Sequence, residues 1–300
     1  MPEFVMLIGL PGCGKSTLAK TLEAKGYHIN SSDDIREEFG FSDIECAKTF
    51  EILHKRVIKD LKEGINSVYD ATNLSRKNRI NFLTMIKNIP CQKTAMLCLV
   101  PVEVCKERNS KRTRVVPEYV YNRLLKNFNV PMLEEGFDKI NVLDMGSRYA
   151  NIKFVVDWDY LDNFDQENHR HENTAGKHMR LAELYVKNKS DRVDLIEAAR
   201  YHDIGKPASK TYKKPNGTRD EEAHYYSHEN VGAYLYLIHK MQINHFISDE
   251  DLYVAALINW HMAPYTRWTS DKCFAKDKLH LTDTFIEDIN LLHEADVNAH

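Results

Sequence analysis

A glycine-rich segment close to the N-terminus constrains the fold of this chain more than any other feature. The segment overlaps the end of the apolar run FVMLIGL (residues 4–10) and reads Gly9-Leu10-Pro11-Gly12-Cys13-Gly14-Lys15-Ser16. This is the spacing of a phosphate-binding loop, in which a buried strand passes through a glycine-rich turn directly into a helix. The sequence therefore predicts a nucleotide site at the carboxyl end of the first strand.

Each residue type in this loop has a physical role toward a triphosphate. Glycines let backbone N–H groups turn inward around phosphate oxygens. Lys15 neutralises the β and γ phosphates, and Ser16 supplies a hydroxyl ligand for Mg²⁺. We therefore expect ATP or another NTP, with Mg²⁺, as the cofactor. The predicted nucleotide-binding residues of the loop are Gly9, Gly12, Cys13, Gly14, Lys15, Ser16 and Thr17.

The rest of the N-terminal half alternates strand-like and helix-like segments. The short runs GYHINSS, NSVYDATN and KTAMLCLV are typical of buried strands. Between them, ECAKTFEILHKRVIKDLKEG repeats apolar residues at the spacing of a helix. Such alternation predicts an α/β domain in which crossover helices flank a parallel sheet.

The second half of the chain has a different pattern. After FDKINVLDMGS and KFVVDW the strand-like runs stop, and the pattern becomes helical with histidine-rich connections. A chain of 300 residues is long enough for two domains of ordinary size. We therefore expect an α/β P-loop domain over residues 1–155 and an all-α domain over residues 156–300. The polar stretch KTYKKPNGTRDEE is expected to be an exposed loop.

Charge and cysteine usage narrow the class of protein. Because the net charge is only -3 at pH 7, nucleic-acid binding would need a local basic patch. The six cysteines lack paired metal-type spacing, which indicates reduced thiols and a cytoplasmic location. The apolar runs are too short for a membrane span or a signal peptide, so we expect no membrane contact. The basic residues that could contact a strand are Arg76, Lys77, Arg79, Arg123 and Lys126.

Carboxylates and an arginine follow the second and third predicted strands. Asp33, Asp34 and Arg36 lie at the carboxyl edge of the sheet, where open α/β folds bind their ligands. There a carboxylate can accept the proton of an attacking hydroxyl, and an arginine can hold a phosphate of the acceptor. Either aspartate could instead cap the following helix. Asp70 ends the third strand and could orient Mg²⁺ or a substrate-binding arginine.

A short basic segment follows the fourth predicted strand. It reads CKERNSKRTRVVP and contains Arg108, Arg112 and Arg114. A charge run of this kind is usually a solvated surface. At this position in a phosphoryl-transfer fold, however, it favours a mobile arginine lid over the triphosphate.

Together, the motifs GLPGCGKST, DDIR, DATN and RNSKR resemble the kinase domain of phage-type polynucleotide 5′-kinases over residues 1–145. The resemblance implies that Asp33 is the general base for a 5′-hydroxyl and that Arg36 contacts a phosphate of the acceptor. It also implies that Arg112 binds the donor phosphates from the lid. The catalytic residues expected in this half are Lys15, Asp33, Arg36, Asp70, Arg108 and Arg112.

Histidines and aspartates recur through the second half at positions that could converge. They are His178, His202, Asp203, His228, His261 and Asp296. A lone histidine on a helix is more often a packed core residue, but a mixed nitrogen and oxygen set suits a divalent transition metal such as Mn, Co, Ni, Zn or Fe. Such a metal supplies hydroxide near neutral pH and polarises a phosphoester, which hydrolysis requires. Lys206, one turn after the aspartate of the His–Asp pair, could neutralise a phosphate oxygen.

This pattern resembles the HD superfamily of metal-dependent phosphohydrolases over residues 160–300. The resemblance implies that the metal core consists of His178, His202, Asp203 and Asp296. His228 and His261 match positions that bind a second metal in some branches and contact phosphate in others, so one metal or two stays open. His171 could be a substrate-side group. Three further histidines are expected to be exposed or to lie behind the ligands: His169, His224 and His293.

Joined in one chain, the two halves resemble the bacterial end-healing enzymes known as HD-Pnk, with the HD part following the kinase part. The resemblance implies phosphorylation of 5′-hydroxyl ends of RNA or DNA from an NTP. It also implies removal of 2′,3′-cyclic, 2′- or 3′-phosphate ends, after which a separate nucleic-acid ligase could act. The residues alone leave two alternatives open. One is a small-molecule or nucleoside kinase fused to a nucleotide phosphohydrolase, and the other is a nucleotide-regulated binding or signalling protein with a structural metal.

Overall fold

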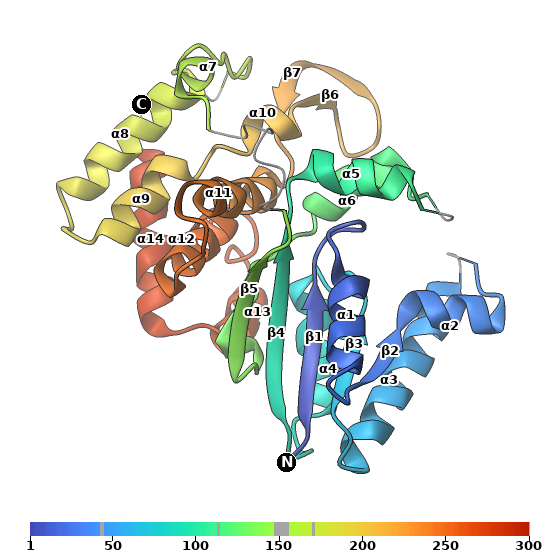
Figure 1. The fold of residues 1–300 in the computed structure, drawn as a ribbon. Helices are drawn as coiled ribbons and strands as arrows, with labels where there is room; N and C mark the ends of the chain where they lie inside the picture. The colour runs from blue at the N-terminus through green and yellow to red at the C-terminus, as the bar shows by residue number, and fades with distance from the viewer. Residues whose placement is uncertain (43–44, 113–114, 147–155, 170–171, 300) are drawn as a thin grey trace. The chain divides into compact units, whose positions relative to one another are not determined.

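The computed structural model describes the chain except for residues 43–44, 113–114, 147–155, 170–171 and 300. The chain forms two compact units (Figure 1). Unit 1 consists of Met1–Leu124 and Pro131–Ala150, and unit 2 consists of Leu125–Val130 and Asn151–His300.

Unit 1 is built on a five-stranded parallel sheet. In the spatial order β2-β3-β1-β4-β5, its strands are β2 (His28–Ser31), β3 (Ser67–Asp70), β1 (Glu3–Ile8), β4 (Gln92–Leu99) and β5 (Lys139–Asp144). Asp70 is in register with Leu7 on one side and with Ser31 on the other. The carboxyl ends of β1, β2 and β3 therefore meet at one edge of the sheet (Figure 1), which confirms the predicted parallel α/β arrangement.

The connecting helices cover both faces of this sheet. They are α1 (Lys15–Glu23), α2 (Ser32–Phe39), α3 (Cys46–Lys62), α4 (Arg76–Met85), α5 (Val102–Ser110) and α6 (Glu118–Leu125), with the short 3-10 turn η2 (Leu133–Glu135) near the end of the unit. Val5 and Leu7 of β1 pack against Leu22 of α1 in one buried cluster. Because side chains alternate along a strand, Phe4 points to the other face, where its ring contacts Phe82 of α4.

Unit 2 is a bundle of helices. They are α7 (Trp158–Asp162), α8 (Ala175–Lys187), α9 (Val193–Tyr201), α10 (Lys206–Ser209), α11 (His228–Asn244), α12 (Asp249–Trp260), α13 (Asp271–Lys278) and α14 (Asp283–Val297). Helices α8, α9, α11, α12 and α14 pack against one another (Figure 1). Tyr234, Tyr236 and Phe285 are fully buried in this bundle, so the helical pattern of the second half does build a core.

A polar hairpin interrupts the helices of unit 2. Strands β6 (Thr211–Lys213) and β7 (Arg219–His224) pair in antiparallel fashion. The expectation of an all-α second half was therefore wrong, and the stretch expected to be an exposed loop is one only over residues 214–218, between the two strands. Most side chains of both strands are polar and are exposed or half-buried, so they show no apolar alternation. The hairpin depends instead on backbone pairing, which extends to an N–H of Ala223 that donates to the carbonyl of Glu167.

The segment Leu125–Val130 belongs to unit 2 through two asparagine side chains. Asn259 donates from Nδ2 to the carbonyl of Phe128 at 3.1 Å, and Asn230 donates to a second carbonyl of the segment at 2.6 Å. The Phe128 ring is fully buried and meets Tyr234 edge to face at 5.2 Å. Unit 2 thus includes a piece of chain that lies far from the rest of it in the sequence.

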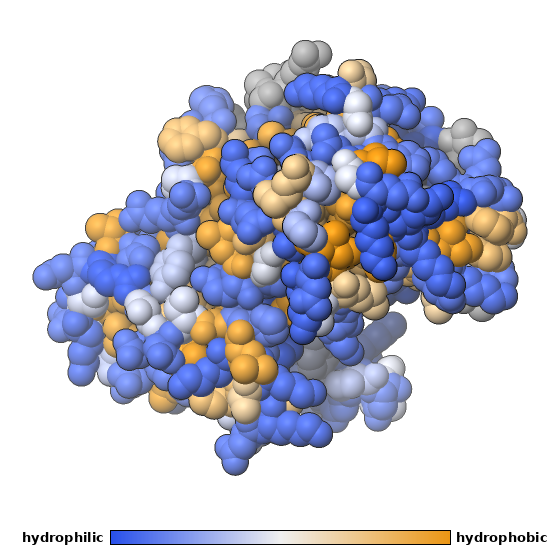
Figure 2. All heavy atoms as spheres, turned by 90° about the horizontal axis from the view of Figure 1, so that it is seen from below, coloured by the Kyte–Doolittle hydropathy of each residue, from blue (hydrophilic) through white to orange (hydrophobic). Residues whose placement is uncertain are grey.

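The face of the molecule turned to the viewer in Figure 2 is mostly hydrophilic, with small separate apolar patches. Among the helices that the structure describes, none is both long and apolar enough to cross a membrane.

Candidate functional site

The glycine-rich segment forms a tight turn between β1 and α1. Gly12 and Gly14 have φ angles of 80° and 102°, in the left-handed region that favours glycine. A Cβ on Gly12 would lie 2.4 Å from the carbonyl oxygen of Cys105, so a larger residue does not fit there. In the first turn of α1, Thr17 and Leu18 donate their N–H groups to the carbonyl of Gly14, so the N–H groups of Lys15 and Ser16 are the ones that can face a ligand. The turn is therefore shaped to bind an anion at a helix N-terminus.

Lys15 and Ser16 are the polar side chains at the start of α1. Lys15 is buried, and its Nζ donates to the carbonyls of Gly9 at 3.0 Å and Leu10 at 2.9 Å. Ser16 donates from Oγ to Oδ2 of Asp70 at 3.3 Å. Burial raises the pKa of Asp70. The structure thus brings together a lysine suited to phosphates and a hydroxyl–carboxylate pair suited to Mg²⁺.

Two other predicted loop residues differ in exposure. Thr17 is exposed on the first turn of α1, whereas Cys13 is fully buried. Although burial alone would raise it, a hydrogen bond with Cys98 and the charge of Lys15 lower the pKa of Cys13 to about 6. The Cys13 side chain therefore supports the loop from inside, which leaves its backbone for a ligand.

Asp33 lies between two guanidinium groups after β2. Arg36 donates from Nη1 to Oδ1 of Asp33 at 3.1 Å, and Nη2 of Arg112 lies 3.5 Å from Oδ2. Ser31 caps α2 by accepting the N–H groups of Asp33 and Asp34, so neither aspartate is the cap. The Asp33 side chain is 56% exposed. It is therefore an accessible carboxylate with two cationic neighbours.

Arg108 lies beside the backbone of the glycine-rich loop. Its guanidinium donates to the carbonyls of Met145 at 2.8 Å and Gly12 at 3.5 Å. Arg114 lies outside the described residues. Of the three arginines of the predicted lid, the structure therefore describes Arg108 and Arg112.

The structure corrects the set of basic residues expected to contact a strand. Arg76 and Arg79 are buried, and Arg79 pairs with Glu135 inside unit 1. Both were therefore wrong as strand contacts, because the sequence did not indicate which face of α4 each residue occupies. Lys77 and Arg123 are exposed. Lys126 is partly buried within the 125–130 segment.

The six predicted metal ligands converge inside unit 2, although they come from five different parts of it. They form two groups that share Asp203. The first group is His178, His202, Asp203 and Asp296, and the second is Asp203, His228 and His261. Within each group the ligand atoms lie within 4.8 Å of one another.

Distances within the first group leave room for one ion. Nε2 of His178 lies 2.8 Å from Oδ1 of Asp296 and 3.2 Å from Nε2 of His202. Nε2 of His202 lies 3.3 Å from Oδ2 of Asp203. Donor atoms at these separations can all bind one metal ion placed between them, as the ligands of a transition metal do.

The second group uses the other oxygen of Asp203. Its Oδ1 lies 3.0 Å from Nε2 of His228, which lies 3.1 Å from Nε2 of His261. One carboxylate therefore faces both groups, with a different oxygen toward each.

The second ring nitrogen of each histidine fixes its tautomer. In all four histidines, Nδ1 lies 2.7–3.0 Å from a backbone carbonyl, and the carbonyls belong to Ala299, Ala199, Tyr225 and Ile258. A nitrogen beside a carbonyl oxygen must carry the proton, so each neutral ring points the lone pair of Nε2 into the cluster. Two pairs of Nε2 atoms then face each other at 3.1 and 3.2 Å, an arrangement that a cation bound between them stabilises.

The pKa values of two histidines in the cluster are shifted in opposite directions. Although burial alone would lower it, Asp203 and Asp296 raise the pKa of His202 to about 10. Burial lowers the pKa of His261 to about 3, so its lone pair stays available. The donor set of imidazoles and carboxylates fits one or two divalent transition metals.

The surroundings of the cluster include Lys206, which was predicted, and two residues that the sequence analysis did not name, Gln166 and Tyr265. Lys206 has its Nζ 2.6 Å from Oδ2 of Asp203. The same Nζ donates to Oε1 of Gln166 at 2.7 Å. Tyr265 lies in the turn after His261, and its ring packs against that of His293. Gln166 and Tyr265 both lie outside helices and strands, where no periodic pattern draws attention to them.

The other four histidines named in the sequence analysis are not among the ligands of the cluster. His169 pairs with Glu222, and His224 pairs with Asp220. His293 packs against the ring of Tyr265. His171 lies outside the described residues.

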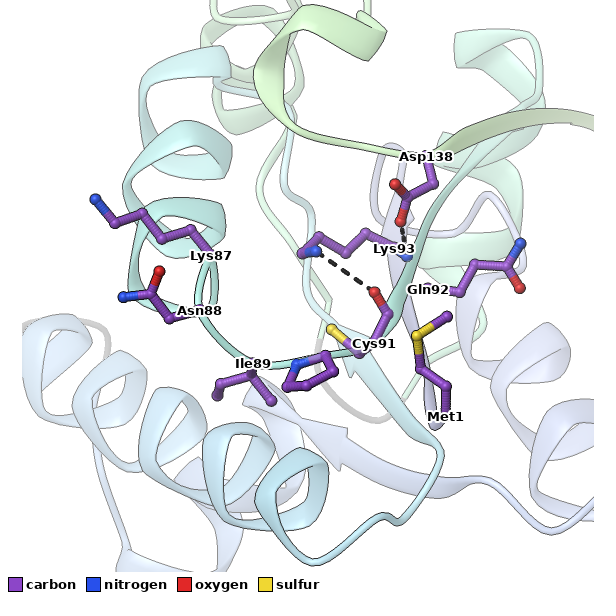
Figure 3. A pocket seen from close by; sticks show the side chains of 9 residues that line it. Met1, Lys87, Asn88, Ile89, Cys91, Gln92, Lys93 and Asp138 are labelled. Carbon is purple, nitrogen blue, oxygen red and sulfur yellow. Dashed lines mark hydrogen bonds between the residues drawn. The ribbon is translucent and has the colours of Figure 1, made fainter.

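A surface pocket in unit 1 has none of this chemistry. It lies at the amino ends of β1 and β4 (Figure 3), at the opposite edge of the sheet from the glycine-rich loop. Its polar contacts are structural: Lys93 donates from Nζ to the carbonyl of Cys91 and from its backbone N–H to Asp138. The pocket therefore adds no candidate site.

Residues 4–131 match the model of a family described as "AAA domain". Over 151 residues the chain is 30% identical to the "Putative bifunctional polynucleotide phosphatase/kinase" of Acanthamoeba polyphaga mimivirus, a match that covers 47% of this chain and 33% of that protein. Over 144 residues it is 26% identical to the "Bifunctional polynucleotide phosphatase/kinase" of Schizosaccharomyces pombe, covering 46% and 32%. The chain thus matches only about a third of the length of these relatives.

A solved structure described as that of the Pnkp1/Rnl/Hen1 RNA repair complex is also similar. The identity is 23%, the TM-score is 0.36, and the match covers 41% of this chain and 42% of that one. The family match spans the glycine-rich loop, Asp70 and Arg112, and with the sheet it makes unit 1 a P-loop domain.

Proposed function

We propose that this chain heals broken nucleic-acid ends. Unit 1 would transfer phosphate from an NTP to a 5′-hydroxyl, and unit 2 would remove phosphate from a 2′,3′-cyclic, 2′- or 3′-phosphate end. The observation that carries the proposal is the presence of a glycine-rich loop with its Ser16–Asp70 pair and of a separate histidine–aspartate cluster, in a chain similar to proteins named bifunctional polynucleotide phosphatase/kinases. The healed ends would then suit a separate ligase.

In unit 1, the groups described above divide the work of phosphoryl transfer. Lys15 and the first turn of α1 bind the phosphates of the NTP, and Ser16 and Asp70 hold its Mg²⁺. Asp33 accepts the proton of the attacking hydroxyl, which its 56% exposure allows an acceptor to reach. Arg36 binds the acceptor, and Arg112 neutralises charge on the transferred phosphate.

In unit 2, the imidazoles and carboxylates of the two groups would hold the metal. The bound metal supplies a nucleophile near neutral pH and polarises the phosphoester. Lys206, fixed between Asp203 and Gln166, places a cation next to the cluster, where it can neutralise a phosphate oxygen. Asp203 holds both metal groups in one geometry, since each of its oxygens faces one of them.

The alternative enzyme, a small-molecule kinase fused to a nucleotide phosphohydrolase, uses the same two clusters and differs in the acceptor. A binding or signalling protein would also retain both clusters. A protein that only binds a nucleotide would not need Asp33, an exposed carboxylate with two arginine neighbours that can accept a proton from an acceptor.

The test uses one short oligonucleotide with a 5′-hydroxyl and a 2′,3′-cyclic phosphate, incubated with ATP, Mg²⁺ and a panel of transition metals. Mass spectrometry follows both ends. We expect the 5′ end to gain a phosphate and the 3′ end to lose one. Asp33→Ala should abolish only the first change and Asp203→Ala only the second, while Asp34→Ala serves as a matched control for Asp33. If neither end changes with the wild-type chain, the polynucleotide proposal fails.

A further inference from the structure

The polar hairpin of unit 2 begins and ends close to residues of the metal cluster. Strand β6 begins at Thr211, shortly after Lys206, and β7 ends at His224, shortly before the ligand His228. The hairpin lies beside α10 at the edge of the helical bundle (Figure 1). A short piece of chain therefore leads from the cluster to the hairpin tip and back.

Hydrogen bonds hold the base of the hairpin beside Lys206. The N–H of Ala223 in β7 donates to the carbonyl of Glu167 at 2.9 Å. The preceding residue, Gln166, accepts a hydrogen bond from Nζ of Lys206 at 2.7 Å. The same Nζ lies 2.6 Å from Oδ2 of Asp203. The hairpin is thus connected to the metal cluster through three successive contacts.

The tip of the hairpin places two like charges on one face. Lys213 and Arg219 are partners in the register of the two strands, and both are exposed. Partners in an antiparallel pair have Cβ atoms about 4.5–5.5 Å apart on the same face, where like charges are destabilising. Within the described part of the chain neither side chain forms an ion pair, although the neighbouring Lys214 pairs with Asp220 at 3.3 Å. An anion bound between the two cations would remove this repulsion.

The tip lies beyond the reach of a mononucleotide bound at the cluster. The ring centroid of Tyr225, directly after β7, lies 5.8 Å from Nζ of Lys206. At ~3.3 Å per strand residue, the chain from Tyr225 to Arg219 spans roughly 20 Å. Phosphates follow one another every ~3.4 Å along a stacked strand of nucleic acid, so roughly six nucleotides cover this distance.

We propose that the hairpin binds the nucleic-acid strand that the phosphohydrolase acts on. Lys213 and Arg219 bind backbone phosphates of a single strand whose terminal phosphate lies at the metal cluster. The inference rests on the proposed function of unit 2 and names the substrate class, an oligonucleotide rather than a mononucleotide. Phosphate contacts position a strand without reading its sequence, which suits an enzyme that acts on breaks at any sequence. The pair also supplies the local basic patch that a chain with a net charge of -3 needs to bind nucleic acid.

The experiment compares two substrates with a 3′-phosphate, using the metal-loaded full chain without NTP. Adenosine 3′-phosphate reaches the cluster alone, whereas an oligoadenylate of about twelve nucleotides also reaches the hairpin tip. The double variant Lys213→Ala with Arg219→Ala removes both cations, and Lys272→Ala, at an exposed lysine of α13, is the matched control. We expect the double variant to raise KM for the oligoadenylate by roughly tenfold. Its KM for adenosine 3′-phosphate should stay unchanged, and the control should change neither value.

The salt dependence of binding gives a second measurement, read by fluorescence anisotropy of a labelled oligoadenylate. Each phosphate contact contributes about 0.7 to the slope of log affinity against log salt concentration for a single strand. The slope of the double variant should therefore be smaller by about 1.4. Lys213→Arg keeps the charge and should keep the wild-type slope.

An equal rise in KM for both substrates would overturn the inference, because the hairpin would then only support Lys206. Equal KM values for both substrates in the wild type, or an unchanged KM for the oligoadenylate in the double variant, would overturn it and leave the phosphohydrolase intact. If the double variant fails to fold, Lys213→Gln with Arg219→Gln replaces it and is judged by the same results. Hydrolysis of neither substrate would overturn the proposed function of unit 2, and the inference with it.

Discussion

A buried ion pair between Arg79 and Glu135 offers a quantitative test of what holds unit 1 together. Nε of Arg79 donates to Oε2 of Glu135 at 2.7 Å, and Nη2 donates to Oε1 at 2.6 Å. Both side chains are 0% exposed. Nη1 also donates to the carbonyls of Asn73 and Leu74, so the pair connects α4 to the chain that follows β3.

Removing only the carboxylate, in Glu135→Leu, leaves the buried guanidinium of Arg79 without its ion-pair partner Glu135. Breaking a buried pair in this way costs about 3–5 kcal/mol, and whole domains are stable by only about 5–15 kcal/mol. We therefore expect a large loss in the free energy of unfolding of unit 1. The double variant Arg79→Met with Glu135→Leu removes both charges, so it should recover part of that loss. The recovery should be incomplete, because the carbonyls of Asn73 and Leu74 lose their donor.

The chain provides an internal control for this measurement. Its three tryptophans, Trp158, Trp260 and Trp268, all lie in unit 2. Hydrogen exchange of the α4 amides in increasing urea reports on unit 1, while tryptophan fluorescence reports on unit 2. A loss below about 1 kcal/mol in the α4 amides would refute the reasoning, as would an equal shift in the fluorescence transition.

Two further predictions use the nucleotide loop and the metal cluster. Gly12→Ala should abolish ATP binding in calorimetry, because its Cβ would lie 2.4 Å from the carbonyl oxygen of Cys105, whereas Gly217→Ala in the open hairpin turn should leave ATP binding unchanged. Removing the metal with a chelator should lower the stability of unit 2, read by tryptophan fluorescence, by about 2.7 kcal/mol relative to a metal concentration of about one hundred times Kd. Asp203→Ala should not respond to the chelator, and an unchanged wild-type transition would argue against a metal at the cluster.

The features that the sequence predicted correctly depend on residues close together in the chain. The glycine-rich turn is recognisable because its glycines, lysine and serine act within one turn and one helix end. The parallel sheet is readable because buried strands are short apolar runs separated by helices with their own period. The six candidate metal ligands differ, because they were expected from residue type and from resemblance to a known family, and the structure brings them together from five separate parts of unit 2.

The tertiary structure decided what depends on contacts between distant segments. The polar hairpin has no apolar pattern, since backbone pairing rather than side-chain burial holds it. Arg79 looked like a surface cation until packing placed Glu135 opposite it. Gln166 gains its role only because folding sets it beside Lys206. A periodic pattern along the chain records which face of an element is buried, but not which distant residue lies across from it, and that choice determines the chemistry around the metal cluster.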